Sequence, residues 1–432
     1  MPNEVHFWSQ FVNNIKSPLG LILLQIISIL LVSRVFGTLF VKLKQPAVVG
    51  EMVAGIFLGP SIMGALAPGF SDFLFPKNSL NNLQFLSQIG LAFFMFIIGM
   101  ELDIEKLRKK AHNAVVISHA SIVFPYFLGV TAAYFLFEKF APTNVGFTAF
   151  ALFMGIAISI TAFPVLARIL HERGLTKSSL GAIVISCAAF DDVSAWCILA
   201  VVIAIAKAGG IGSAIFTIAL TIVFVMIMLI LVRPLLKKIC NQFEESDDLN
   251  KNLVVIVFFV MLLSACITEV IGIHALFGAF LAGVIMPQKT SIRNLLMEKI
   301  EDVSILMLLP LFFAFTGLRT QIGLLNQGHL WVTFGFIILV AVVGKFGGSA
   351  IAAKLTGQTW KDSFSIGALM NTRGLMELIV LNIGYDLGIL SPALFAIMVI
   401  MALSTTFMTG PMLDIIEYIS NKTSLKRAEI LK

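Results

Sequence analysis

The chain contains 432 residues, of which 58% are hydrophobic and only 12% are charged, and its formal net charge is +6 at pH 7. About a quarter of the residues of a soluble domain are usually charged. Together with a mean hydropathy of +0.98, this composition excludes an ordinary soluble protein and predicts an all-α polytopic membrane protein.

Apolar runs follow one another along nearly the whole chain. A transmembrane helix needs roughly 17–25 mostly apolar residues, and on this criterion the sequence predicts thirteen helices. We expect them at residues 19–40, 47–66, 80–100, 112–137, 147–171, 177–207, 211–235, 250–271, 273–288, 301–318, 329–354, 361–385 and 391–418. A polar break at 268–274 separates the eighth helix from the ninth. Without that break the count would be twelve and the topology would change.

The loop charges predict the orientation of these helices. With thirteen helices, 22 lysines and arginines fall on one side of the membrane and five on the other. By the positive-inside rule the first side is cytoplasmic, which places the N-terminus outside and the C-terminus inside. The positive net charge is then a consequence of topology, and no nucleic-acid partner is expected. The first segment lacks the features of a cleaved signal peptide, so we expect a retained helix.

Two adjacent aspartates, Asp191 and Asp192, lie in the middle of the sixth predicted helix. A carboxylate at the centre of a span costs roughly 2.5–3.5 kcal/mol on insertion scales, so the pair indicates a hydrated cavity, a cationic partner or both. Lys345, Thr161 and Thr372 fall at a similar depth in other helices. At about 1.5 Å per residue, all lie near the midplane of the bilayer core.

Two of the predicted helices contain polar interruptions at this depth. The fifth helix contains Ser159, Thr161 and Pro164, and the twelfth contains Asn371, Thr372 and Arg373 between two glycines. Proline removes a backbone donor, and hydroxyl groups can satisfy the freed carbonyls. Either interruption alone could be an ordinary kink. Because the two helices are seven apart and oppositely oriented, the pair instead indicates the binding site of a secondary transporter with inverted repeats.

Four sequence stretches carry a family resemblance: residues 45–51, 161–170, 190–193 and 371–378. They resemble the monovalent cation:proton antiporter-2 family, which includes Kef-, Nap- and Ger-type exchangers and plant cation/proton exchangers. The resemblance covers about residues 18–418, and the stretches occur in the family's order.

The resemblance implies an inverted-repeat antiporter fold of thirteen helices, with two crossed discontinuous helices, in a homodimer. The expected segments are a dimerisation domain at 1–110 and 249–327, a transport domain at 111–208 and 328–420, a linker helix at 209–248 and a short cytoplasmic tail at 421–432. It also implies that Asp192 binds the cation or the proton, and that Asp191 pairs with Lys345. A double aspartate is typical of the electrogenic members.

We therefore predict a transporter, not an enzyme, that exchanges Na⁺ or K⁺ for protons without a cofactor, with Na⁺ favoured, in the inner membrane of a bacterium. The alternatives are an electroneutral K⁺/H⁺ exchanger and a Kef-like K⁺ efflux system with a separate regulatory subunit. Thr161 is expected at the ion site beside the two aspartates. Arg373 and Glu377 lie four residues apart on one helix face, and we expect them to pair with each other; the alternative is a role in shaping the helix crossover or in gating.

Two other functions fit the sequence less well. An intramembrane aspartyl protease also uses two aspartates, but they come from different helices, and no Gly-Asp dipeptide occurs here. A passive channel is expected to have a selectivity filter or a ring of charges, and neither is evident. No Gly-x-Gly-x-x-Gly motif occurs in the sequence, so no nucleotide-binding domain is expected within the chain.

Overall fold

The computed structural model describes residues 14, 17–43, 45–101, 111–175, 178–207, 211–243, 251–287, 297, 300–326 and 328–430. Within these ranges the chain forms helices and turns and no β-strand. The segments 102–110, 244–250 and 288–296, between predicted helices, lie outside the described residues, as do residues 431–432 of the predicted tail. Several of the basic residues that predict the orientation fall in these loops, and the orientation stays a prediction.

The helices of the first half of the chain follow the predicted apolar runs closely. They are α2 (Pro18–Lys42), α3 (Ala47–Leu58), α4 (Met63–Leu66), α5 (Pro68–Leu74), η1 (Lys77–Ser79), α6 (Leu80–Glu101), α8 (Ala111–Phe140), α9 (Phe147–Ser159), α10 (Phe163–Glu172) and α11 (Ser179–Lys207). The run at 47–66 is interrupted after Leu58. Gly59 and Pro60 follow at this point, and proline cannot donate a helical hydrogen bond.

The second half of the chain contains α12 (Ile211–Ile227), η2 (Met228–Val232), α13 (Arg233–Phe243), α14 (Lys251–Ile271), α15 (Ala275–Val284), η3 (Ser304–Leu308), α17 (Leu309–Arg319), η4 (Ile322–Asn326), α18 (Gly328–Val342), η5 (Val343–Gly347), α19 (Gly348–Leu355), α20 (Trp360–Met370), α21 (Leu375–Asp386) and α22 (Pro392–Ile430). The last helix is longer than predicted, because the segment expected as a tail continues the helix to Ile430. Residues 419–430 contain no glycine or proline, and several of them are good helix formers.

Twelve helices of the described chain are long and apolar enough to cross a membrane. The all-helical membrane protein predicted from composition is therefore confirmed. The ninth predicted helix corresponds to α15, which has 10 residues. It is separated from α14 at the expected polar break, where Gly272 and His274 have positive φ angles of 98° and 85°. The count of thirteen spans stays a prediction.

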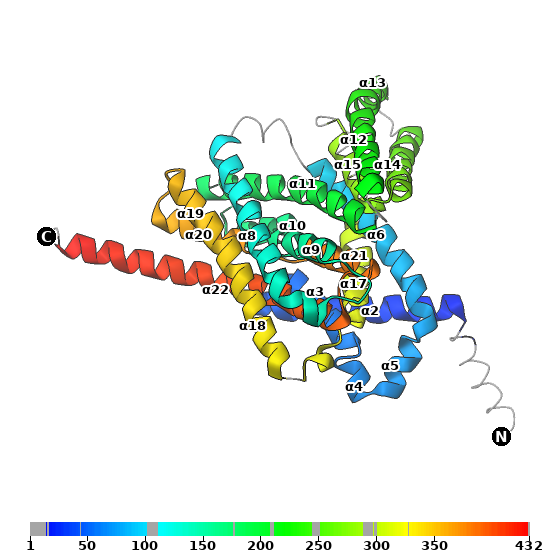
Figure 1. Cartoon of the computed structure of the whole chain (residues 1–432), viewed down its shortest axis with the longest axis horizontal. Helices are drawn as coiled ribbons and strands as arrows, with labels where there is room; N and C mark the ends of the chain where they lie inside the picture. Colours follow the sequence, from blue (N-terminus) through cyan, green and yellow to red (C-terminus); the bar gives the residue numbers. More distant parts are fainter. Residues whose placement is uncertain are drawn as a thin grey trace.

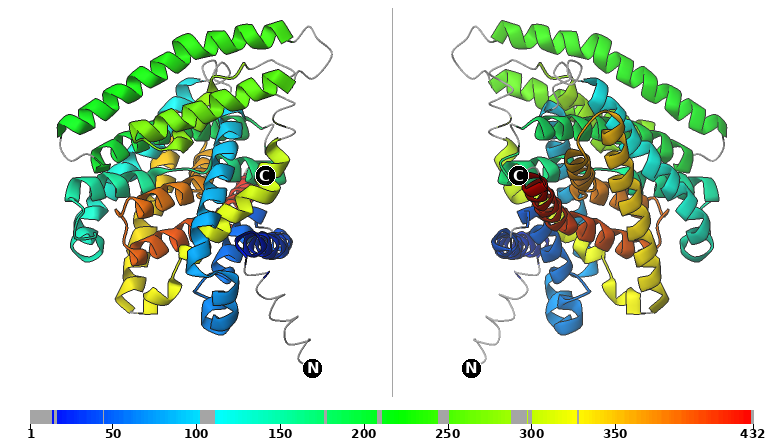
Figure 2. Two further views of the ribbon diagram at one scale, coloured as in Figure 1. Left: turned by 90° about the vertical axis from the view of Figure 1, so that its right-hand side faces the viewer. Right: turned by 90° about the vertical axis from the view of Figure 1, so that its left-hand side faces the viewer.

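The helices pack in two groups. Helices α2, α3, α6, α14, α15 and α17 contact mainly one another, and helices α8–α11 and α18–α22 together form the second group. Helices α12 and α13, joined through η2, form one long helix along the edge of the molecule (Figure 2). Helix α22 extends past the body of the molecule on the side away from the start of α2 (Figure 1). The predicted transport and dimerisation domains follow similar lines, but their separate roles stay predictions.

Glycine allows the closest helix contacts in the first group. A Cβ atom added at Gly317 of α17 would overlap the backbone of Gly55 in α3, and one added at Gly283 of α15 would lie too close to Gly99 of α6. Small residues let helices approach in a membrane, where van der Waals packing and not burial from water drives their association.

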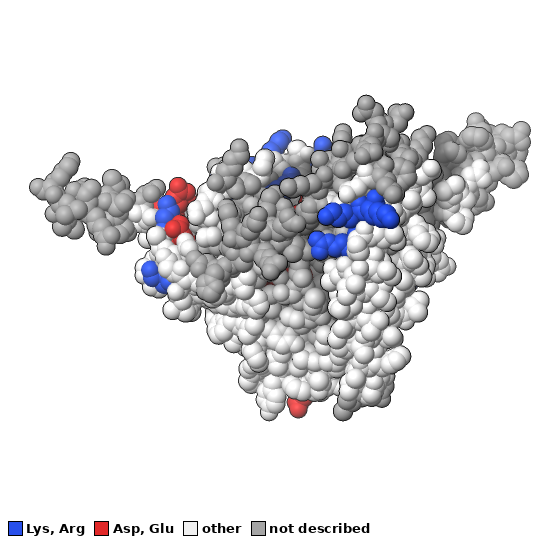
Figure 3. Space-filling model, turned by 90° about the horizontal axis from the view of Figure 1, so that it is seen from above, with Lys and Arg blue, Asp and Glu red and all other residues white. Residues whose placement is uncertain are grey.

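The outer surface of the molecule is that of a protein surrounded by lipid. Large apolar side chains of α2 such as Leu19, Ile27 and Leu31 are 69%, 62% and 66% exposed. In Figure 3 the broad lower part of the visible surface is almost free of charged residues.

Candidate functional site

The fifth predicted span is broken between α9 and α10. The intervening residues 160–162 are non-helical, and Ile160 and Ala162 have extended backbone angles. Pro164 lies in the first turn of α10, where its missing N–H group needs no helical partner. The sequence predicted an interruption at this point because proline and two hydroxyl residues occur together there.

The twelfth predicted span is broken between α20 and α21. Gly374 caps α21 with a φ of 157°, and an added Cβ would lie 2.9 Å from a methyl group of Val165 in α10. The two breaks meet, because the N–H of Ala162 donates to the carbonyl of Thr372 at 3.1 Å. Helices α9, α10 and α21 pass through the middle of the molecule (Figure 1).

All four carbonyls at the C-terminal end of α9 have donors. A helix that ends leaves its last four carbonyls without helical partners, and in a membrane these must be satisfied internally. The Ser159 hydroxyl donates to the carbonyl of Ile156 at 3.0 Å, and the Lys345 ammonium donates to the carbonyl of Ser159. The Arg373 guanidinium donates to the carbonyls of Ala157, at 3.2 Å, and Ile158. Two buried cations therefore cap the negative end of the α9 dipole.

Asp191 accepts hydrogen bonds from four side chains that come from three elements besides its own helix. They are Ser118 and Ser121 of α8 at 2.6 and 2.7 Å, Thr161 of the α9–α10 break at 2.8 Å, and Lys345 of η5 at 2.8 Å. The Asp191 side chain is only 1% exposed. Three of these donors reach Oδ2 and one reaches Oδ1, so both carboxylate oxygens of Asp191 are hydrogen-bonded in this conformation.

Lys345 lies on the π-helical turn η5, and its side chain is fully buried. Its ammonium group has three protons and donates to Asp191, to the carbonyl of Ser159 and, at 2.9 Å, to the carbonyl of Ser121. The ion pair expected between Asp191 and Lys345 is therefore present, with both members hydrogen-bonded. Single π-helical turns occur frequently at functional sites, since they change the direction in which a side chain points.

Asp192 has a different environment from its neighbour. Its side chain is also fully buried, but neither carboxylate oxygen has a hydrogen-bond partner among the described residues. Consecutive helical residues point about 100° apart, so the two aspartates face different surroundings. A buried carboxylate without donors is expensive, and either a proton or a cation would relieve the cost.

The other predicted polar residues lie around the two breaks. Arg373 pairs with Glu377 at 3.2 Å, and both side chains are fully buried. The hydroxyls of Thr372 and Thr409 are 3.2 Å apart. Neither side-chain atom of the buried Asn371 has a hydrogen-bond partner within the described chain. The Thr161 hydroxyl oxygen also lies 3.2 Å from the carbonyl of Met370, so this carbonyl at the end of α20 and Asp191 share its single proton.

Sequence reasoning missed Ser118 and Ser121. Both are fully buried, and they lie three residues apart on α8 and therefore on one helix face. Serine is common in membrane helices, and Pro125, about one turn after Ser121, lies inside the continuous helix α8. The spacing of the two serines acquires meaning only once α8 is known to pack against α11.

Comparison with known proteins agrees with this geometry. A family model described as sodium/hydrogen exchanger, transmembrane, matches residues 27–416. The chain belongs to this family. It is thus an integral membrane cation/proton antiporter and not an enzyme. The match covers both broken helices, the two aspartates and Lys345.

Individual relatives support the same assignment. The chain is 42% identical over 393 residues to the Na⁺/H⁺ antiporter NhaS4 of Synechocystis sp., covering 91% of this exchanger and 96% of that protein. It is 40% identical to cation/H⁺ antiporter 17 of Arabidopsis thaliana and 33% identical to K⁺/H⁺ antiporter 1 of Saccharomyces cerevisiae, with 93% of this exchanger aligned in each case. It spans about half of these two relatives, 49% and 47% of their lengths.

A solved structure has the same fold. The sodium proton antiporter MjNhaP1 of Methanocaldococcus jannaschii superposes with a TM-score of 0.64, and the superposition covers 88% of this exchanger and 92% of that chain. The sequences are only 14% identical, so the likeness concerns the fold alone.

Proposed function

We propose that this exchanger binds a monovalent cation or protons in turn at Asp192, and that alternating access delivers them to opposite sides of the membrane. The observation that carries the proposal is the contrast between the two aspartates. Asp191 accepts four hydrogen bonds, whereas Asp192 accepts none from the described residues.

The chemistry follows from this contrast. Sodium and potassium are hard cations that prefer oxygen ligands, and a carboxylate can hold either a cation or a proton. Competition between the two for one carboxylate is sufficient for exchange. Asp191 would act as the fixed counter-ion of Lys345, and the hydroxyls around it would hold the broken helices in register.

We propose Na⁺ as the favoured cation and K⁺ as the alternative. The 42% identity to a protein named as a Na⁺/H⁺ antiporter, which aligns over 96% of its length, supports Na⁺. The 33% identity to a protein named as a K⁺/H⁺ antiporter keeps K⁺ open. Within the family, the plant cation/H⁺ antiporters and the motifs around the two aspartates support the antiporter-2 subtype.

We also propose that exchange is electrogenic, with two protons moved against one cation. The second proton would leave the Lys345 ammonium when Asp192 takes the cation, which requires the ion pair with Asp191 to open during the cycle. If the pair stayed closed, one proton would exchange for one cation and no net charge would move. That electroneutral exchange is the alternative.

The proposal also includes the oligomeric state of the protein, its membrane and its orientation. We propose a homodimer in a bacterial inner membrane with its C-terminus in the cytoplasm, and a role in pH homeostasis. A separate regulatory subunit is the partner expected under the Kef-like alternative.

The experiment that tests the function uses purified protein in proteoliposomes with a pH-sensitive dye inside. Addition of NaCl or KCl should drive proton movement in the wild type. Asp192→Asn should leave less than about a tenth of the activity, because the exchanged ligand is lost. Asp362→Asn is the matched control, since Asp362 lies on the surface at the start of α20 and accepts from the Thr359 hydroxyl at 2.7 Å. Full exchange by Asp192→Asn would contradict the proposal.

A further inference from the structure

A second polar cluster lies at the far end of α21, away from the aspartates. Helix α21 has 12 residues and runs from the break at Gly374 to Asp386. At 1.5 Å per residue its end lies about 18 Å along the helix axis from the break. Any movement of the broken helix is therefore transmitted along α21 to this cluster.

The cluster joins α21 to α17. Arg319, the last residue of α17, pairs with Asp386 at 2.6 Å and donates to the side-chain oxygen of Asn382 at 3.3 Å. The Asn382 amide donates to the hydroxyl of Thr316 in α17 at 2.8 Å. Gln84 of α6 adds a longer contact to Asp386 at 3.4 Å. We call Arg319, Asn382 and Asp386 the clasp.

The arginine of the clasp is also held by aromatic rings. Its guanidinium carbon lies 4.1 Å from the centroid of the Phe315 ring and 5.4 Å from that of Tyr385. These rings come from α17 and α21, so the guanidinium contacts rings of both helices, whereas its N–H groups donate to α21.

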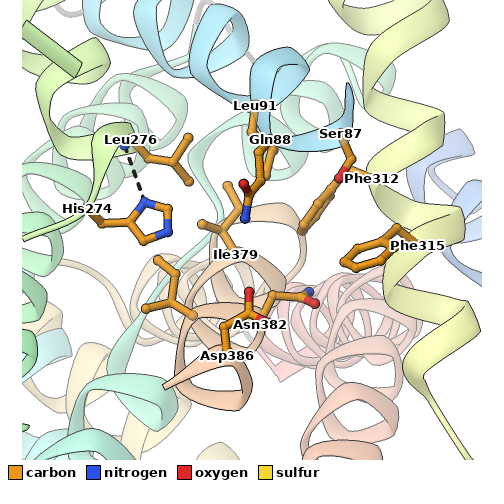
Figure 4. A pocket seen from close by; sticks show the side chains of 11 residues that line it. Ser87, Gln88, Leu91, His274, Leu276, Phe312, Phe315, Ile379, Asn382 and Asp386 are labelled. Atoms are coloured by element: carbon orange, nitrogen blue, oxygen red, sulfur yellow. Dashed lines mark hydrogen bonds between the residues drawn. The ribbon is translucent and has the colours of Figure 1, made fainter. Parts of the chain in front are cut away.

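A small pocket opens beside the clasp, between α21 and the helices α6, α15 and α17 (Figure 4). Its volume is only about 20 Å³, room for about one water molecule. Ser87, Gln88 and Asp386 contribute polar atoms, and Phe312 closes one side.

The clasp and its pocket lie at the seam between the two packing groups. Helix α21 belongs to the group that carries both aspartates, and α17 and α6 belong to the other. Contacts between two groups that move relative to each other exist in only one of their arrangements. Such contacts shift the equilibrium toward the arrangement in which they form.

We propose that Arg319, Asn382 and Asp386 form the gate on the predicted outer face of this exchanger, and that the gate opens once per transport cycle. Asp192 is fully buried and the pocket is too small for an ion to pass, so the seam is closed in this conformation. When Arg319 withdraws, the oxygens of Asp386 and Asn382 are freed to attract an incoming monovalent cation. The gate rests on the proposed function, because it has a role only if ions pass.

A reversible cross-link tests the gate. The Asn382 amide and the Thr316 hydroxyl are 2.8 Å apart, so Thr316→Cys with Asn382→Cys should cross-link under oxidant or a short thiol-specific linker. Cross-linking should lower exchange at least ~tenfold, and reductant should restore it, because the open state is no longer populated. Wild type and each single-cysteine variant should not respond to the same treatment.

The outcomes separate the gate from the proposed function. If the cross-linked protein exchanges as fast as its reduced form, the gate is wrong and antiport stands. If the wild type exchanges neither Na⁺ nor K⁺ for protons, the proposed function fails and the gate fails with it.

A labelling experiment tests the gate without relying on exchange. Ser87 lines the pocket and is 1% exposed, so Ser87→Cys reports its opening to a membrane-impermeant maleimide, measured at residue 87 by mass spectrometry. Adding Arg319→Gln should speed labelling at least ~threefold, because the open state gains population. Adding Arg173→Gln breaks another 2.6 Å pair, with Asp414, inside one packing group, and should not change the rate. Equal rates in the two double variants would overturn the gate.

Discussion

Replacing Lys345 by glutamine removes the ammonium group that pairs with Asp191 inside the membrane. The two charged atoms are 2.8 Å apart, and the side chains are 0% and 1% exposed. The substitution also removes a donor from the carbonyls of Ser121 and Ser159. We expect both stability and exchange to fall.

The size of the loss follows from what remains around Asp191. Breaking a buried ion pair by removing one partner typically costs about 3–5 kcal/mol, because the other charge stays buried. The hydroxyls of Ser118, Ser121 and Thr161 still donate to Asp191, so we expect the lower end, about 3 kcal/mol. That corresponds to roughly a hundredfold change in the ratio of folded to unfolded protein.

The measurement is the free energy of unfolding in detergent for three variants. Lys354→Gln is the control, because Lys354 is partly exposed, donates to the carbonyl of Gln358 at 3.2 Å and lies beside the Trp360 ring. It should lose no more than about 1 kcal/mol. Lys345→Gln combined with Asp191→Asn removes both charges and should recover at least half of the loss. The reasoning is refuted if Lys345→Gln is as stable as the control, or if the double variant is no more stable than the single one.

Three further predictions follow from the site and the packing. Ser118→Ala should lower the free energy of unfolding by about 1.5–3 kcal/mol, since it removes a donor from a charged group, whereas Ser186→Ala, whose hydroxyl donates to the carbonyl of Ala182 in its own helix, should change it little; equal effects would argue against the Asp191 network. Gly317→Ala should reduce the yield of folded protein because its Cβ overlaps the backbone of Gly55, while Gly323→Ala meets open space, and a normal yield for the first would contradict the tight contact of α3 with α17. Exchange in proteoliposomes should change with a valinomycin-set potential, because one elementary charge is worth about 2.3 kcal/mol per 100 mV, and rates indifferent to potential would favour the electroneutral alternative.

Local patterns were enough to predict the breaks in the helices. Pro164 cannot continue a helix, and Gly374 adopts a backbone angle that other residues rarely take. Gly59 and Pro60 carried the same kind of signal within the second span, but it went unused because the apolar run continues across them. The end of α22 was predicted too early, because hydropathy marks where the lipid ends and not where the helix ends.

The hydrogen-bond partners of the two aspartates could be predicted only in part without the tertiary structure. The resemblance to a family assigned Asp192 as the ion ligand and Asp191 as the partner of Lys345, and the ion pair is present. The sequence did not indicate that Ser118 and Ser121 contribute two more donors, because serines in an apolar helix carry no sign of their partners.

The clasp could not be predicted from the sequence for a similar reason. Arg319 counted only as a loop charge on the predicted outer side, and Asp386 lies 67 positions further along the chain. A charge at a helix end is ordinary in a membrane protein, and only the packing of α21 against α17 turns two such charges into a pair.

The sequence by itself determined that this protein is a bundle of membrane helices, and it marked the depth at which charges and broken helices coincide. Hydrophobicity and backbone chemistry act locally, so single residues and short runs are sufficient to predict membrane helices and their breaks. Only the tertiary structure decided which aspartate is hydrogen-bonded and which is left without donors among the described residues. That difference depends on side chains from α8, the α9–α10 break and η5, and their meeting point is set by packing between segments far apart in the chain.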